Sequence, residues 1–129
     1  GECPVSLYAA HSAWDSKRDL WVFRNDGKLC SFDPRSASFQ KLPDLYRQDE
    51  DSGGSRCIAY DSTHDAYIAD GETGGDTRVC HPDSRRVENV RAGRLQLPEG
   101  YLAYDPRTDL TVLVSHRSVF VFRYVPGGR

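Results

Sequence analysis

Histidine offers the widest range of chemistry in this sequence, because a neutral imidazole can ligate a transition metal. The chain has four histidines: His11, His64, His81 and His116. Among the histidine and cysteine residues, only Cys80 and His81 stand at a local ligand spacing, and neighbouring residues of a strand point to opposite faces. We therefore interpret the histidines as structural or solvated and expect no resident metal ion.

Carboxylates gather in the glycine-rich stretch "DGETGGD", residues 70–76. Oxygen ligands on such a loop suit calcium, so Asp70, Glu72 and Asp76 could wrap this cation. The stretch lacks the ligand spacing of an EF-hand loop. We expect a solvated turn with no cofactor, and calcium at these three residues is the alternative.

Three other aspartates, Asp15, Asp61 and Asp105, belong to a phrase that the chain repeats. It reads "AWDSKRDLWVF" from residue 13, "AYDSTHDAYIA" from residue 59 and "AYDPRTDLTVL" from residue 103, so the aspartates are 46 and 44 residues apart. An aspartate that ends a strand can bond the backbone of the following turn. Recurrence at a turn predicts a structural role for these residues rather than catalysis.

Each phrase predicts a strand, a turn and a second strand, since nearly continuous apolar runs follow the turns. The runs are Leu20–Phe23, Ala66–Ala69 and Leu110–Val114, and we expect these strands to be covered on both faces. Third strands follow in every repeat and fourth strands in the first two. The repeats cover about residues 11–45, 57–93 and 101–124 of one domain, residues 1–129. Four short antiparallel strands in about 45 residues are typical of a propeller blade.

The pattern "AWDSKRDLWVF" followed by "LCSFDPRSASFQKLPDL" resembles the kelch-type β-propeller repeat. The family's paired glycines after the second strand are replaced by Arg24-Asn25, Asp70-Gly71 and Ser115-His116. This departure leaves other propeller families, such as the WD40 and NHL types, as alternatives. The resemblance implies an all-β fold of three blades of four antiparallel strands.

Three blades cannot close a ring, because propellers have four to eight. We therefore expect either a homodimer, whose two copies make a six-bladed ring, or a missing propeller segment. The third repeat contains only three strands, and the segment "ECPVSLYAA" could supply a fourth strand to another blade. The absence of Met and of a basic and apolar leader predicts a mature, processed or excised segment.

Loops between strands are the expected ligand-binding surface of such a scaffold. The candidate binding residues are aromatic, basic or acidic side chains in three loops: Tyr46, Arg47, Asp70, Glu72, Asp76, His116 and Arg117. The loop after Tyr46 is acidic and the connection around Arg85 to Arg94 is basic, which would suit recognition or the docking of two chains. Two solvated loops with an ordinary variation in charge are the alternative.

The overall composition of the chain limits the kinds of partner that we expect. The net charge of −2 gives no electrostatic reason to expect nucleic acid, and no apolar run is long enough to span a membrane. Four cysteines without a Cys-x-x-Cys motif favour disulfides and a secreted or periplasmic protein. Equivalent positions of neighbouring blades lie too far apart for a disulfide, so we predict that Cys30 does not pair with Cys80. Cys3 is the natural partner for one of them if the N-terminal strand closes a blade.

The sequence contains no phosphate loop, no Ser-His-Asp order and no sialidase Asp box. We therefore expect a non-enzymatic module that binds a protein or a glycan through its loops. The alternative is half of a propeller enzyme, acting on carbohydrate or as an oxidoreductase, with its active site in the channel. A third possibility is an assembly piece without a ligand of its own.

Overall fold

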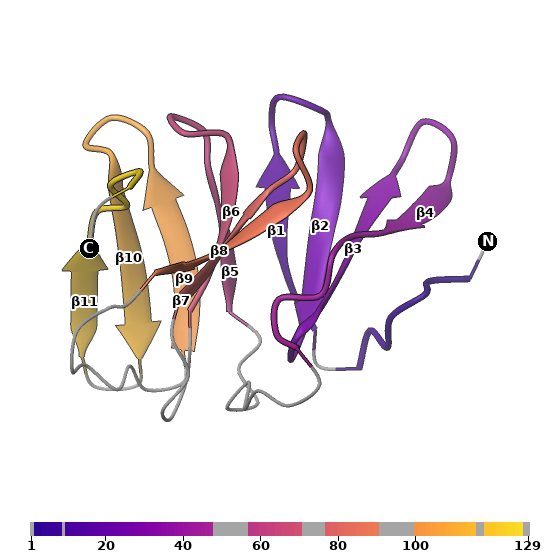
Figure 1. Cartoon of the computed structure of the whole chain (residues 1–129), viewed down its shortest axis with the longest axis horizontal. Helices are drawn as coiled ribbons and strands as arrows, with labels where there is room; N and C mark the ends of the chain where they lie inside the picture. The colour runs from indigo at the N-terminus through magenta and orange to yellow at the C-terminus, as the bar shows by residue number, and fades with distance from the viewer. Residues whose placement is uncertain are drawn as a thin grey trace.

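The computed structural model describes residues 2–8, 10–47, 57–70, 77–90, 100–115 and 118–127. These residues form eleven strands in three antiparallel sheets (Figure 1), and the predicted all-β class is confirmed. None of the described residues lies in a helix that is long and apolar enough to cross a membrane. The sheets follow one another in chain order, and the described part of the chain does not close into a ring.

The three sheets correspond to the three repeats of the sequence. In each sheet, consecutive strands pair with one another. The first sheet contains β1 His11–Asp15, β2 Leu20–Asn25, β3 Lys28–Asp33 and β4 Ser38–Lys41. The second contains β5 Ile58–Asp61, β6 Ala66–Ala69, β7 Thr77–His81 and β8 Arg86–Val90. The third contains β9 Gly100–Asp105, β10 Leu110–Ser115 and β11 Val119–Phe122.

The first hairpin of every sheet turns in the same way. Asp15 ends β1, and its Oδ1 accepts hydrogen bonds from the backbone N–H groups of Lys17 and Arg18 at 3.0 and 3.1 Å. Asp61 accepts one from the N–H of His64, and Asp105 one from the N–H of Arg107. The last loop residue has a positive φ each time: Asp19 at 55°, Asp65 at 52° and Asp109 at 55°. Aspartate tolerates this left-handed conformation better than most residues, which explains both aspartates of the repeated phrase.

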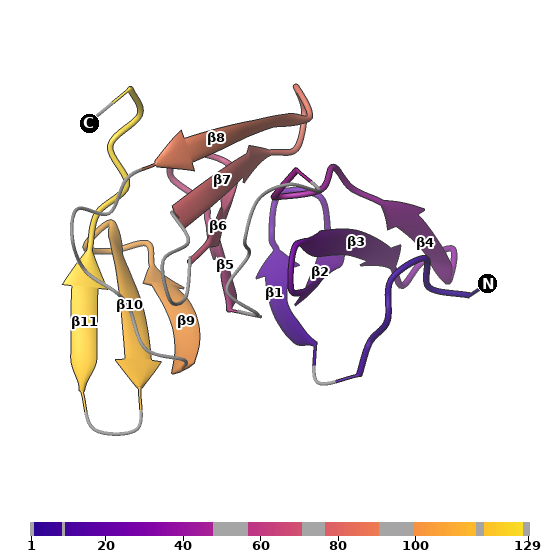
Figure 2. The ribbon, with the colours of Figure 1, turned by 60° about the horizontal axis from the view of Figure 1, so that its bottom comes forward.

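Packing between the sheets joins the repeats into one body, with β1 beside β5 and β5 beside β9 (Figure 2). Val22 and Leu29 of the first sheet pack with Ile58 and Tyr67 of the second. On its other face, the second sheet packs against Leu113 and other apolar residues of the third. The second sheet is therefore covered on both sides.

Two-sided burial was predicted for β2, β6 and β10. It holds for β6, whose four residues are all buried. In β2 and β10 the burial alternates, and Trp21 and Val114 remain exposed. The reason is that no described sheet covers the outer face of the first or the third sheet.

These two outer faces differ in chemistry. On the first sheet, Trp14, Trp21, Phe32 and Phe39 pair in register, one residue on each strand, and we call them the aromatic row. Trp14 and Trp21 lie edge to face with ring centroids 5.0 Å apart, and both are about 40% exposed, at 39% and 41%. On the third sheet, exposed valines stand on the outer side: Val114, Val119 and Val121.

Candidate functional site

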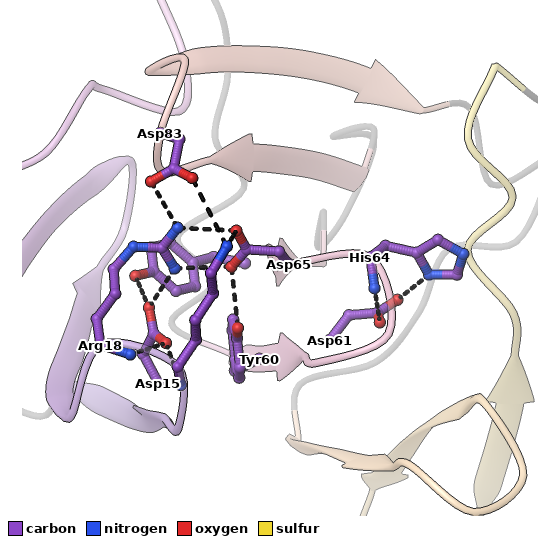
Figure 3. Close-up of polar contacts among 9 residues, drawn as sticks. Asp15, Arg18, Tyr60, Asp61, His64, Asp65 and Asp83 are labelled. Atoms are coloured by element: carbon purple, nitrogen blue, oxygen red, sulfur yellow. Dashed lines mark hydrogen bonds and ion pairs between the residues drawn. The ribbon is translucent and has the colours of Figure 1, made fainter.

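The main polar cluster lies where the first two sheets meet, at the ends that carry their hairpin turns (Figure 3). Arg18, in the turn between β1 and β2, lies at its centre. Its Nη1 donates to Asp15 Oδ2 at 2.9 Å and to Asp65 Oδ1 at 2.7 Å. Its Nη2 donates to Asp65 Oδ2 at 2.8 Å and to Asp83 Oδ1 at 2.7 Å. One guanidinium thus joins a carboxylate of its own sheet to two carboxylates of the next sheet.

The charges in this cluster stabilise one another. The hydrogen bond from Arg18, supported by Lys17 and Tyr60, holds the pKa of Asp65 well below its usual range. Asp65 in turn, with Asp83 and Asp15, holds the pKa of Arg18 above its usual value. Tyr60 donates to Asp65 at 2.9 Å, and burial, followed by this contact, raises the pKa of its hydroxyl. The side chains of this cluster therefore keep their charges near neutral pH. Such fixed charges suit a structural ion-pair network better than catalysis by proton transfer.

Tyr67 connects the same ion-pair network to the buried part of the interface between the first two sheets. Its hydroxyl, on β6, donates to Asp15 Oδ2, and the Asp15 side chain has no solvent exposure. Burial raises the pKa of Tyr67, and the hydrogen bond to Asp15 adds to the effect. The phenol therefore stays protonated and serves as a donor across the sheet interface.

A second cluster occupies the equivalent place between the second and third sheets. His64 Nδ1 lies 2.9 Å from Asp61 Oδ2 and 3.8 Å from Asp109 Oδ1. Tyr104 donates to Asp109 Oδ1 at 2.8 Å, and its hydroxyl also bonds that of Thr63. Burial raises the pKa of Tyr104 to about 12. One ligand atom from each of Asp61, His64 and Asp109 lies within 4.8 Å of the others.

The repeat explains why the two clusters match. The residue three after the turn aspartate is Arg18 in the first repeat and His64 in the second, and each reaches toward the left-handed aspartate of the next sheet. In the third repeat this position holds Thr108, whose Oγ1 donates to Asp105 at 2.9 Å. The recurring aspartates thus shape the turns and receive the contacts that hold the sheets together.

Tyr46 and Arg47, two of the predicted binding residues, line a groove between the first sheet's trailing loop and the second sheet. The groove has a volume of about 500 Å³, and its other lining residues are Asp44, Leu45, Arg78, Val87 and Asn89. The Arg78 guanidinium lies 4.5 Å from the centroid of the Tyr46 ring, and its Nε donates to the Leu45 carbonyl at 3.1 Å. Both side chains are buried, with Tyr46 8% and Arg78 5% exposed, so they form the floor of the hollow, and Arg47 is its exposed arginine. Arginine and aromatic residues together are enriched at recognition surfaces.

Asp70, the first residue of the glycine-rich stretch in which calcium was the alternative to a solvated turn, faces another arginine. Asp70 and Arg24 are both fully buried, and Arg24 Nη1 lies 3.5 Å from Asp70 Oδ1. The same Nη1 donates to the carbonyls of Cys57 and Asp70 at 2.6 and 2.9 Å. Burial lowers the pKa of Arg24 against the effect of these partners. The Arg24 guanidinium of the first sheet is therefore the cation that pairs with the Asp70 carboxylate.

The remaining predicted binding residues, Glu72, Asp76, His116 and Arg117, lie outside the described residues. Sequence reasoning missed the residues that bridge the sheets, above all Arg18 and Arg78. A signal for Arg18 exists in the sequence, because it shares a repeat column with His64. Arg78 carries no comparable signal, because its partner Tyr46 belongs to another repeat.

A smaller hollow of about 240 Å³ lies beside the first residues of the inner strands, where Ser12, Ile58 and Leu102 contribute to its wall. His11 stacks on Tyr101 there, with ring centroids 4.8 Å apart and planes 10° from parallel. The two rings connect the first and third sheets across the edge of the second.

No protein-family model matches the chain, and no curated protein matches it either.

Proposed function

We propose that this protein is a non-enzymatic binding module built of propeller-type blades, and that its groove at Tyr46, Arg47 and Arg78 recognises an acidic segment of a partner protein. The observation that carries the proposal is the lining of this groove, where a cation stacks on an aromatic ring beside a further, exposed arginine. Such residues give a carboxylate both charge and a planar surface. A glycan that carries carboxylates is the alternative ligand.

The carboxylates near the turns support a binding role over an enzymatic one. Asp15 and Asp65 are engaged by Arg18, and Asp61 is engaged by His64. A pair of carboxylates for glycoside hydrolysis needs one acid and one base that face the substrate. These carboxylates instead face the neighbouring sheet.

The test is fluorescence anisotropy with a labelled hexaglutamate peptide as the probe and an oligogalacturonate as the competitor. We expect Arg47→Ala to weaken binding of the peptide by about fivefold, corresponding to ~1 kcal/mol for an exposed charge. Arg35→Ala removes an exposed arginine of the first sheet that does not line the groove, and is the matched control. Equal losses in both variants would contradict the proposal, and tighter binding of the oligosaccharide would favour the glycan.

We further propose that the three sheets are blades of a larger ring, completed by a second copy of this chain. The support is that equivalent rows of residues in successive sheets have equivalent positions for contact with a neighbouring sheet. Ala59, Ile68 and Val79 form a cross-strand row of the second sheet, and Ala103, Val112 and Val121 form the equivalent row of the third sheet. The first row belongs to the face that the third sheet covers, whereas the second row belongs to an outer face. The aromatic row of the first sheet is the equivalent of Tyr60 and Tyr67, which contact a preceding sheet.

Each copy therefore has two uncovered faces, the aromatic row of its first sheet and the outer face of its third sheet. Two copies can bury both faces by packing the third sheet of each copy against the first sheet of the other. We expect light scattering with size-exclusion chromatography to give twice the chain mass of 14.5 kDa. Trp21→Arg should convert this particle into a monomer, whereas Arg47→Ala, at an exposed residue of the groove between the first two sheets, should leave it intact. A wild-type monomer would contradict the two-copy ring and favour a further propeller segment as the missing part.

A further inference from the structure

The cluster between the second and third sheets contains three side chains that bind metals. We propose that Asp61, His64 and Asp109 form a binding site for a divalent first-row transition metal ion that joins the two sheets. Asp61 ends β5, His64 lies in the following turn, and Asp109 lies in the turn after β9. Their ligand atoms lie within 4.8 Å of one another, although Asp61 and Asp109 are far apart in sequence.

The interface between the first and second sheets has the same arrangement of carboxylates, and there a cation lies between them. There, the equivalent carboxylates of Asp15 and Asp65 share the permanently charged guanidinium of Arg18, at 2.9 and 2.7 Å. At the second interface histidine replaces arginine, and histidine carries no permanent charge. The imidazole reaches Asp61 at 2.9 Å but lies 3.8 Å from Asp109. A dication between the three groups would restore the bridging charge that arginine supplies in the first interface.

The two distances from His64 suit a small cation. A tetrahedral ion with bonds of ~2.1 Å holds its ligands roughly 3.4 Å apart, and the two distances from His64 Nδ1 lie on either side of this value. One imidazole nitrogen with two carboxylates is a ligand set for zinc, manganese or iron(II). Binding through Nδ1 requires the tautomer that carries its proton on Nε2. The hydrogen bond between Nδ1 and Asp61 is then replaced by two bonds to the ion.

Neighbouring groups already orient the ligands. The N–H of His64 donates to Asp61 Oδ1 at 2.9 Å, which leaves Oδ2 directed at the imidazole. Tyr104 donates to Asp109 Oδ1 at 2.8 Å. Such outer contacts fix metal ligands in the geometry that an ion needs. The Asp61 side chain is 1% exposed, whereas those of His64 and Asp109 are 22% and 30% exposed, so an ion can enter from solvent and keep water in its remaining positions.

The experiment is thermal unfolding of the chelator-treated protein with added Zn²⁺ or Mn²⁺. We expect the wild-type midpoint to rise by about 5–10 °C when the ion is present at 100 times its Kd. His64→Arg recreates the first interface, so we expect a folded protein whose midpoint does not respond to the ion. His81→Ala removes another partly buried histidine that pairs with a carboxylate, Glu88, and should respond as the wild type does.

Three results would overturn the proposal. One is a wild-type midpoint that does not change, with no binding heat in calorimetry. Another is an equal response in His64→Arg. The absorption spectrum of the Co²⁺ form gives a second readout, in which we expect ligand-field bands without a thiolate charge-transfer band. An intense thiolate band that survives in His64→Arg would assign the ion to cysteines instead and would also overturn the proposal.

Discussion

Replacement of Arg18 by alanine tests whether the guanidinium holds the first two sheets together. The variant removes four hydrogen bonds to three carboxylates. Asp15 is the partner that matters most, because its side chain is fully buried, whereas Asp83 is 74% exposed. Removal of one member of a buried ion pair costs about 3–5 kcal/mol, and exposed pairs contribute about 0–1 kcal/mol.

Asp15 keeps several donors in this variant, namely the backbone N–H groups of residues 17 and 18 and the hydroxyl of Tyr67. The cost should therefore lie at the lower end, at about 3 kcal/mol. For a chain of this length, that loss corresponds to a midpoint lower by roughly 10 °C. Arg35→Ala is the matched control, because Arg35 also follows a turn aspartate, Asp33, but its side chain is 67% exposed. We expect the control to lose no more than about 0.5 kcal/mol.

The pH dependence gives this prediction a second check. The Arg18 guanidinium keeps the pKa of Asp65 below its usual range in the folded protein. Asp65 therefore adds stability at pH values above its unfolded pKa of about 3.9, and this stability is lost as the pH falls toward the lower, folded value. The difference between wild type and Arg18→Ala should be complete at pH 7 and should shrink below about pH 4.

Urea unfolding followed by tryptophan fluorescence at pH 7, 5 and 3 measures both effects. A difference below about 1 kcal/mol at pH 7 would refute the reasoning, as would a difference that does not change with pH. If Arg18→Ala does not fold, Arg18→Lys keeps the charge without the two-pronged geometry. We then expect a loss of about 1–2 kcal/mol that follows the same pH dependence.

Two further predictions concern Tyr67 and the cysteines. Tyr67→Phe should lower the free energy of unfolding by about 1–2 kcal/mol, because buried Asp15 loses a donor; Tyr8→Phe, at a residue that is 84% exposed, should change little in the same urea titration. All four cysteines are free in the structure, but Cys3 Sγ and Cys30 Sγ lie 3.0 Å apart, so treatment with oxidised glutathione followed by non-reducing peptide mapping should find a Cys3–Cys30 disulfide, and a Cys30–Cys80 disulfide would contradict this prediction. Burial, followed by contact with Cys3, raises the pKa of Cys30 to about 12, so we expect the cross-link to form faster as the pH rises.

Local features of the sequence predicted the hairpins well. The aspartates at positions 15, 61 and 105 mark the strand ends because their bonds to the turn span only two or three residues. The chain also turns with positive φ at Ala37 and Arg85, where neither residue type favours that conformation. The positions of the turns were therefore readable from the aspartates that end the strands, whereas the left-handed conformation of Ala37 and Arg85 was not readable from their residue types.

Contacts between the sheets were harder to predict. Arg18 and Asp83 are 65 positions apart, so their meeting depends on how whole sheets pack. The sequence search for metal ligands considered local spacing and therefore did not connect His64 with Asp109. The groove residues Tyr46 and Arg47 were chosen from their loop, but the part played by Arg78 follows only from the packing of the second sheet against that loop.

The column that contains Arg18, His64 and Thr108 has a consequence for how such a chain can grow. Each of the first two hairpins carries a residue that reaches the following sheet, and the second and third carry the aspartate that receives it. A duplicated repeat would therefore contain both the residue that reaches the following sheet and the aspartate that receives such a residue from the preceding sheet. New units could be added during evolution without inventing a new interface, and one substitution in the column would suffice to give the new junction a different strength.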